Sequence, residues 1–92
     1  MKRKITWIRH GQSTWNAEGK WQGHTDVPLS ELGREQATAL GRRLDPQRFD
    51  AVYSSDLTRS RQTCELALPK ANMLLDKRLR EINFGVYEGK SR

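Results

Sequence analysis

Short apolar runs alternate with longer amphipathic stretches along this chain of 92 residues, and the alternation limits how the chain can fold. The β-branched and aromatic residues at 5–8 predict a strand buried on both faces, and 49–53 and 73–75 predict two further short strands. Helical patterns lie between them, at about 31–44 and up to about residue 68. Alternating strands and helices imply right-handed crossovers and a mostly parallel sheet. The predicted fold class is therefore α/β, as a partial βαβαβ portion.

The ends of both predicted helices carry recognisable signals. Ser30 is a suitable N-cap for the first helix, and Pro46 is expected to stop it. Ser55 or Asp56 is expected to cap the second helix, which Pro69 ends. The apolar face predicted for the first helix consists of Leu32, Ala37, Leu40 and Leu44.

Arg9-His10-Gly11 directly follows the first predicted strand and begins a long polar segment that reaches residue 29. Loops of that length are usually functional or disordered. Open α/β sheets bind their ligands at the carboxyl ends of strands, where an imidazole can act as a nucleophile and a guanidinium can hold a phosphoryl group. On its own, a histidine after a strand is more often a structural or surface residue.

Further motifs give this tripeptide its context. They read RHGQSTWN at 9–16, WQGHTD at 21–26, PLSELGREQA at 28–37, SSDLTRSRQT at 54–63 and LREINFGVYEG at 79–89. Together they resemble the histidine phosphatase superfamily, the phosphoglycerate mutase-like enzymes. The resemblance implies a mostly parallel sheet with helices on both faces. Family members are about twice as long and carry a second catalytic histidine further on. We therefore expect residues 1–92 to be the N-terminal portion of a single domain whose C-terminal half is absent.

The resemblance also implies roles for particular residues. His10 would attack the phosphorus and carry a phosphohistidine, while Glu81 would protonate the leaving oxygen and later help to activate water. Arg59 falls in the first turn of its predicted helix, where a cation opposes the helix dipole unless an anion lies nearby. Simpler alternatives are a solvent-exposed arginine and a glutamate that pairs with Arg80. The expected substrate-binding residues are Arg9, Gly11, Asn16, Gln22, Gly23 and Arg59.

The predicted function is that of a phosphomonoester phosphatase acting through a phosphohistidine intermediate. The segment at 83–89 is more similar to the phosphatase branch of the family than to the mutases. Two alternatives stay open, which are phosphoglycerate mutase-type phosphoryl transfer and a truncated, non-catalytic phosphate-binding protein. His24, the only other histidine, does not replace the missing one by any sequence argument.

Composition narrows the expected partners. The net charge is +6, but the basic residues are scattered, which favours a phosphorylated small-molecule substrate over a nucleic acid. Two distant histidines and a single cysteine, Cys64, predict no metal site and no cofactor. The single cysteine also fits a reducing, cytoplasmic location, and no apolar run is long enough to span a membrane. An incomplete sheet would leave an open strand edge and apolar patches, so we expect the chain to be poorly soluble, partly unfolded or self-associating.

Overall fold

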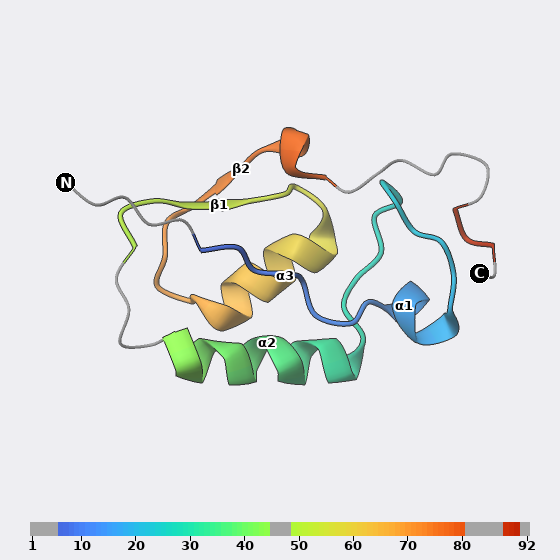
Figure 1. Cartoon of the computed structure of the whole chain (residues 1–92), viewed down its shortest axis with the longest axis horizontal. Helices are drawn as coiled ribbons and strands as arrows, with labels where there is room; N and C mark the ends of the chain where they lie inside the picture. Colours follow the sequence, from blue (N-terminus) through green and yellow to red (C-terminus); the bar gives the residue numbers. More distant parts are fainter. Residues whose placement is uncertain (1–5, 45–48, 81–87, 91–92) are drawn as a thin grey trace.

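The computed structural model describes residues 6–44, 49–80 and 88–90 (Figure 1). Two short parallel strands and two longer helices form its frame, so the predicted α/β class is confirmed. The elements are α1 (Thr14–Glu18), α2 (Glu31–Leu44), β1 (Val52–Ser54), α3 (Thr58–Ala67), β2 (Met73–Leu75) and a 3₁₀ helix at Lys77–Leu79. None of the helices in this described part is long and apolar enough to cross a membrane.

The sheet is built from one βαβ unit. β1 and β2 pair in parallel, with Val52 opposite Met73 and Ser54 opposite Leu75. Parallel strands require a crossover connection, and α3 provides it. Figure 1 shows α3 lying between this sheet and α2. The predicted strand at 73–75 has the bounds of β2, whereas β1 starts later than predicted.

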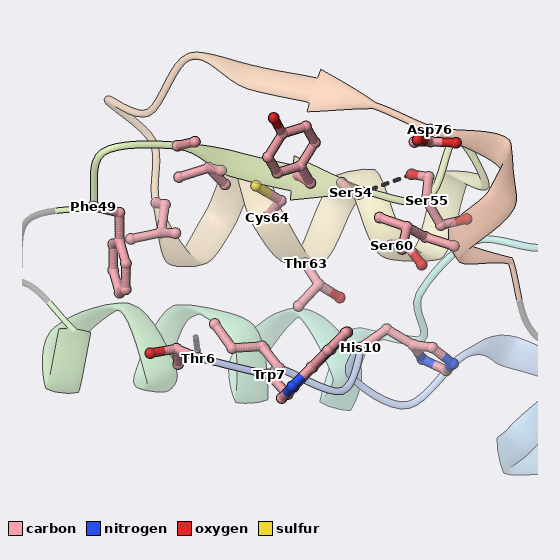
Figure 2. Close-up of a pocket in the computed structure, with 16 residues that line it drawn as sticks. Thr6, Trp7, His10, Phe49, Ser54, Ser55, Ser60, Thr63, Cys64 and Asp76 are labelled. Carbon is pink, nitrogen blue, oxygen red and sulfur yellow. Dashed lines mark hydrogen bonds between the residues drawn. The ribbon is translucent and has the colours of Figure 1, made fainter. Parts of the chain in front are cut away.

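The strand predicted at 5–8 is not formed in the described residues, which begin at residue 6. The backbone from 6 to 12 has no strand assignment, and Trp7 is 83% exposed rather than buried. A cavity of about 560 Å³ lies between this segment and β1, and Trp7 and Ser54 are among the residues that line it (Figure 2). A strand needs a directly hydrogen-bonded neighbour, and among the described residues β1 pairs with β2 and not with this segment.

α2 has the bounds predicted for it, and Ser30 caps it, because the Gly33 amide donates to Ser30 Oγ at 3.1 Å. Two of the four residues predicted for its buried face, Ala37 and Leu44, are buried, whereas Leu40 is only half-buried. Leu32 is 49% exposed, and Gly33 is buried instead, next to Ala37 and Leu44. The reason is a close backbone approach, because a Cβ on Gly33 would overlap the carbonyl of Gln12.

α3 begins at Thr58, and neither predicted cap residue caps it. The N-cap position is Leu57, which makes no side-chain cap bond. Asp26, from a distant loop, instead accepts from the Thr58 amide at 2.5 Å. Asp56 does not cap the helix, because its two carboxylate oxygens each accept a hydrogen bond from Arg80 at 2.6 Å.

The core lies where the two long helices meet the chain before α2. α2 and α3 pack closely at Gly41, where a Cβ would come within 2.8 Å of the Ala67 carbonyl oxygen. Arg59, Leu29 and Ser13 are the largest side chains that are fully buried. The buried apolar residues are Val27, Leu29, Ala37, Leu44, Leu57 and Ala67.

Candidate active site

A small cavity of about 340 Å³ adjoins His10. The chain after residue 8, the helix α1 and the helix α2 all contribute to its wall. Six polar residues or glycines line it, namely Arg9, His10, Gly11, Gln12, Asn16 and Gln36. We call this space the His10 pocket. Four predicted site residues come together here: Arg9, His10, Gly11 and Asn16.

The imidazole of His10 is oriented by its own neighbour. His10 Nδ1 lies 2.6 Å from the carbonyl oxygen of Gly11. A carbonyl can only accept a hydrogen bond, so Nδ1 carries the proton in the neutral ring and the lone pair is on Nε2. This tautomer is the one that a nucleophilic Nε2 requires.

Gly11 joins the pocket to the two long helices. Its amide donates to Thr63 Oγ1 on α3 at 3.1 Å, and that hydroxyl donates to the Arg59 carbonyl at 2.8 Å. On the other side a Cβ would overlap the carbonyl of Gly33 on α2. The next residue, Gln12, donates from its amide to Gln36 Oε1 at 2.9 Å. Residues 9–12, which we call the pocket segment, are therefore held between α2 and α3.

Asn16 reaches the pocket from α1, a short helix inside the segment predicted as a loop. Ser13 Oγ accepts from the Asn16 amide at 3.0 Å, and Asn16 Oδ1 accepts from the Ser13 amide at 3.1 Å. This is a capping box, with Asn16 in place of the usual Glu or Gln. Because its oxygen is used in the cap, Asn16 can offer only its amide N–H groups to an anion.

A second, buried cluster contains three further predicted site residues, Gln22, Gly23 and Arg59. The Arg59 side chain is 0% exposed, and Nη1 donates to the Thr25 carbonyl at 2.8 Å, while Nη2 donates to the Gly23 carbonyl. Gln22 Oε1 accepts from Ser13 Oγ. Arg59 is not among the residues that line the His10 pocket in the described chain.

The chain itself supplies an anion near Arg59 at the start of α3. It is the carboxylate of Asp26, which also accepts from the Thr58 amide. That hydrogen bond lowers the pKa of Asp26 below its usual value, and the nearby Arg61 and Arg59 charges lower it further. The chain thus supplies an anion of its own to this helix N-terminus.

Sequence reasoning gave no role to Glu88, although it lies in the last of the quoted motifs. Its carboxylate accepts from the His24 amide at 3.3 Å, from the Thr25 amide at 2.8 Å and from the Thr25 hydroxyl. These contacts join residues more than sixty positions apart, so no local pattern could have revealed them. Glu81, the predicted proton donor, lies outside the described residues.

His10 also lines the larger cavity between residues 6–8 and β1 (Figure 2). Ser54, Ser55 and Thr63 are among the other residues that line it. Cys64 lines it too, and burial raises the pKa of its thiol. In the part of the chain that the structure describes, no group of three or more histidine, cysteine or acidic side chains could hold a metal ion.

A family model for the histidine phosphatase superfamily, branch 1, matches residues 5–92. This chain belongs to that superfamily. It is 42% identical over 90 residues to phosphoglycerate mutase-like protein 4 of Arabidopsis thaliana, covering 94% of this chain and 39% of the relative. The chain therefore spans about two fifths of that relative's length.

Solved structures of superfamily members have the same fold. Phosphoglycerate mutase from Bacillus anthracis superimposes with a TM-score of 0.85 at 40% identity, over 89% of this chain and 38% of the other. Phosphoserine phosphatase from Entamoeba histolytica, solved with 3-phosphoglyceric acid, superimposes with a TM-score of 0.83 at 37% identity, over 91% and 42%. The predicted phosphoglycerate mutase-like fold is confirmed, and both phosphatases and mutases are among its neighbours.

Proposed function

We propose that this chain is the N-terminal portion of a phosphomonoester phosphatase domain that works through a phosphohistidine intermediate. The observation that carries the proposal is the contact of 2.6 Å between His10 Nδ1 and the Gly11 carbonyl, inside a pocket that Arg9 and Asn16 also line. It favours the tautomer with its lone pair on Nε2, next to groups that can neutralise a phosphate.

The reaction has two steps. Nε2 attacks the phosphorus, the bond from phosphorus to the ester oxygen breaks, and the departing alcohol takes a proton from Glu81. Water then attacks the phosphohistidine and gives its proton to Glu81, so that inorganic phosphate leaves and both residues return to their starting states. Positioning and charge neutralisation supply most of the acceleration in such reactions.

The phosphoryl oxygens would be held chiefly by the residues around the His10 pocket. Arg9 offers a guanidinium, Gly11 a close backbone approach and Asn16 its amide N–H groups. Gln22, Gly23 and Arg59 join the binding site, in this proposal, from the buried cluster that reaches the pocket through Ser13 and Thr63.

The proposed substrate is a phosphorylated small molecule in the cytoplasm. The Entamoeba phosphatase was solved with 3-phosphoglyceric acid, a small phosphate monoester of this kind. Mutase-type transfer is the second candidate, since relatives named phosphoglycerate mutase align at 40% identity. A mutase would move phosphate between hydroxyl groups and would need a phosphorylated primer.

The deciding experiment measures phosphate release from p-nitrophenyl phosphate by the 92-residue chain and by its His10→Ala variant. Turnover that His10→Ala abolishes would support the phosphohistidine route. Glu65→Gln, a change at an exposed position of α3 that does not line the His10 pocket, is the control, and its turnover should be unchanged.

A folded chain that binds inorganic phosphate but releases none would instead support the non-catalytic alternative. Equal turnover in wild type and His10→Ala would contradict the proposed nucleophile. Adding a phosphorylated primer and an acceptor alcohol then separates a phosphatase from a mutase, because only a mutase gains activity from them.

A further inference from the structure

One peptide unit of the loop before α2 is held at both ends by opposite charges. The carbonyl of Gly23 accepts from Arg59 Nη2, and the amide of the following residue, His24, donates to the Glu88 carboxylate at 3.3 Å. A cation at the carbonyl and an anion at the amide both stabilise the same orientation of the peptide dipole. This unit is therefore fixed in direction as well as in place.

The same two side chains also hold the next residue. The amide of Thr25 donates to Glu88 at 2.8 Å, and the carbonyl of Thr25 accepts from Arg59 Nη1 at 2.8 Å. Gly23 has φ +53°, a conformation that favours glycine, so the turn is built for this geometry. We call residues 22–25 the clamped turn.

The clamped turn is connected to the His10 pocket. Gln22 Oε1 accepts from Ser13 Oγ, and Ser13 caps α1 through its reciprocal bonds with Asn16. Ser13 and Gln22 are 0% and 5% exposed, so water competes little for these bonds. A displacement of the turn would move Gln22, then the cap, and then the Asn16 amide that faces the pocket.

The tail that carries Glu88 is tied to the same loop by its backbone. The Trp21 amide donates to the Lys90 carbonyl at 2.9 Å, and the Gly89 amide donates to the Trp21 carbonyl at 2.6 Å. These two bonds do not depend on the Glu88 side chain. They keep the tail in place when that side chain is changed, which makes a substitution at Glu88 informative.

We propose that Glu88 is a positioning residue, which acts with Arg59 on the clamped turn and sets the place of Asn16 at the His10 pocket through Gln22 and Ser13. The role in phosphate binding rests on the proposed function, whereas the coupling from Glu88 to Asn16 does not. Glu88 itself is not among the residues that line the pocket in the described chain, so it does not act as a catalytic residue.

The test compares Glu88→Gln with Glu88→Asp and with Glu65→Gln, a matched change at an exposed glutamate of α3. Glutamine has one acceptor oxygen in place of two and lacks the charge, so it cannot hold all three donors. Aspartate keeps the carboxylate on a shorter stem and should restore part of the effect.

Two readouts on the full chain separate positioning from a purely structural role. The first is the ¹H–¹⁵N spectrum, in which Glu88→Gln should shift the His24 and Thr25 amides and also the Asn16 side-chain amide. The second is inorganic phosphate binding, which should weaken by roughly tenfold if Asn16 loses one hydrogen bond to a charged group. Glu65→Gln should change neither.

Shifts confined to His24 and Thr25, with Asn16 unmoved, would overturn the proposal, as would an unchanged spectrum. If the wild-type chain binds no phosphate, the proposed function fails, but the Asn16 shift still decides the coupling. If it does bind phosphate and the affinity is equal in wild type and Glu88→Gln, the positioning role fails while the proposed function survives.

Discussion

Gly11 and Gly33 lie back to back where the pocket segment crosses α2. A Cβ on Gly11 would come within 3.0 Å of Gly33 Cα, and one on Gly33 within 2.9 Å of the Gln12 amide nitrogen. Real side-chain atoms do not approach this closely, so both positions require glycine for steric reasons. The crossing brings His10 and the N-terminal half of α2 together, which is how Gln36 comes to line the pocket.

The substitution Gly33→Ala should therefore destabilise the fold and disturb the site together. The added methyl forces the backbone at Gln12 away, and overpacking of this kind costs about 1–3 kcal/mol. Urea unfolding followed by circular dichroism measures the loss. Ala39→Ser, at an exposed position of the same helix, is the control and should change the free energy of unfolding by less than about 1 kcal/mol. A Gly33→Ala variant as stable as wild type would show that the crossing can open without cost.

Substitution of Arg59 should be among the most damaging changes in the chain. Arg59→Leu leaves the carbonyls of Gly23 and Thr25 without their guanidinium donors, at about 1–3 kcal/mol for each buried group. Arg59→Lys keeps the charge but loses the planar fork that spans both carbonyls, and we expect an intermediate loss. Thermal unfolding of both variants, beside the exposed Arg34→Ala as control, gives the order. Equal stability of all three would mean that the buried guanidinium contributes nothing.

The parts of the fold that were predicted from the sequence depend on local patterns. The bounds of α2 follow from a Ser30 cap and a helical apolar period, and β2 follows from a short apolar run. The strand predicted at 5–8 was wrong because strand formation needs a hydrogen-bonded partner, which periodicity does not reveal. The cap predicted at Asp56 was wrong for a similar reason, since Arg80, 24 residues away, holds that carboxylate.

The residues of the candidate site also differ in whether the sequence could predict their roles. Motif resemblance brought out Arg9, His10, Gly11 and Asn16, which the fold gathers around one pocket. The roles of Glu88 and of the buried Arg59 depend on which backbone groups surround them. Those groups come from a loop that is distant in sequence, so neither could be predicted from neighbouring residues.

The ion pair between Asp76 and Arg78 should persist to low pH. Hydrogen bonds from Arg78 lower the pKa of Asp76 to about 2 from its usual 3.8. Because the folded-state pKa lies below the unfolded one, the stabilisation is fully present above about pH 4 and is lost as the pH falls toward 2. Carbon-detected NMR titration of the Asp76 carboxyl measures this directly.

Arg78→Gln should return the pKa of Asp76 toward 3.8, whereas Lys77→Gln, which removes a positive charge from the adjacent position, should leave it near 2. An unchanged pKa in Arg78→Gln would assign the effect to the Arg78 backbone amide, which also donates to Asp76.

Self-association should occur through exposed apolar side chains on β1 and β2 and beside the larger cavity. Tyr53, Leu74 and Leu75 on β1 and β2 are 61%, 49% and 51% exposed, and Trp7 across the larger cavity is 83% exposed. Such apolar groups around a short, open sheet favour association with another chain. Sedimentation velocity over a concentration series should show a dimer or larger species, and Trp7→Ser should weaken it. Leu32→Ser, a matched change at an exposed apolar residue outside that cavity, should not.

Alkylation of Cys64 gives an independent test of this self-association, because the thiol lines the larger cavity. Burial raises its pKa, so the reactive thiolate is scarce at neutral pH and alkylation by iodoacetamide should be slow in the folded chain. If a second copy covers the cavity, the rate should fall further as the protein concentration rises, and Trp7→Ser should abolish that dependence. A monomer at every concentration, with an alkylation rate that never changes, would show that this face stays uncovered in solution.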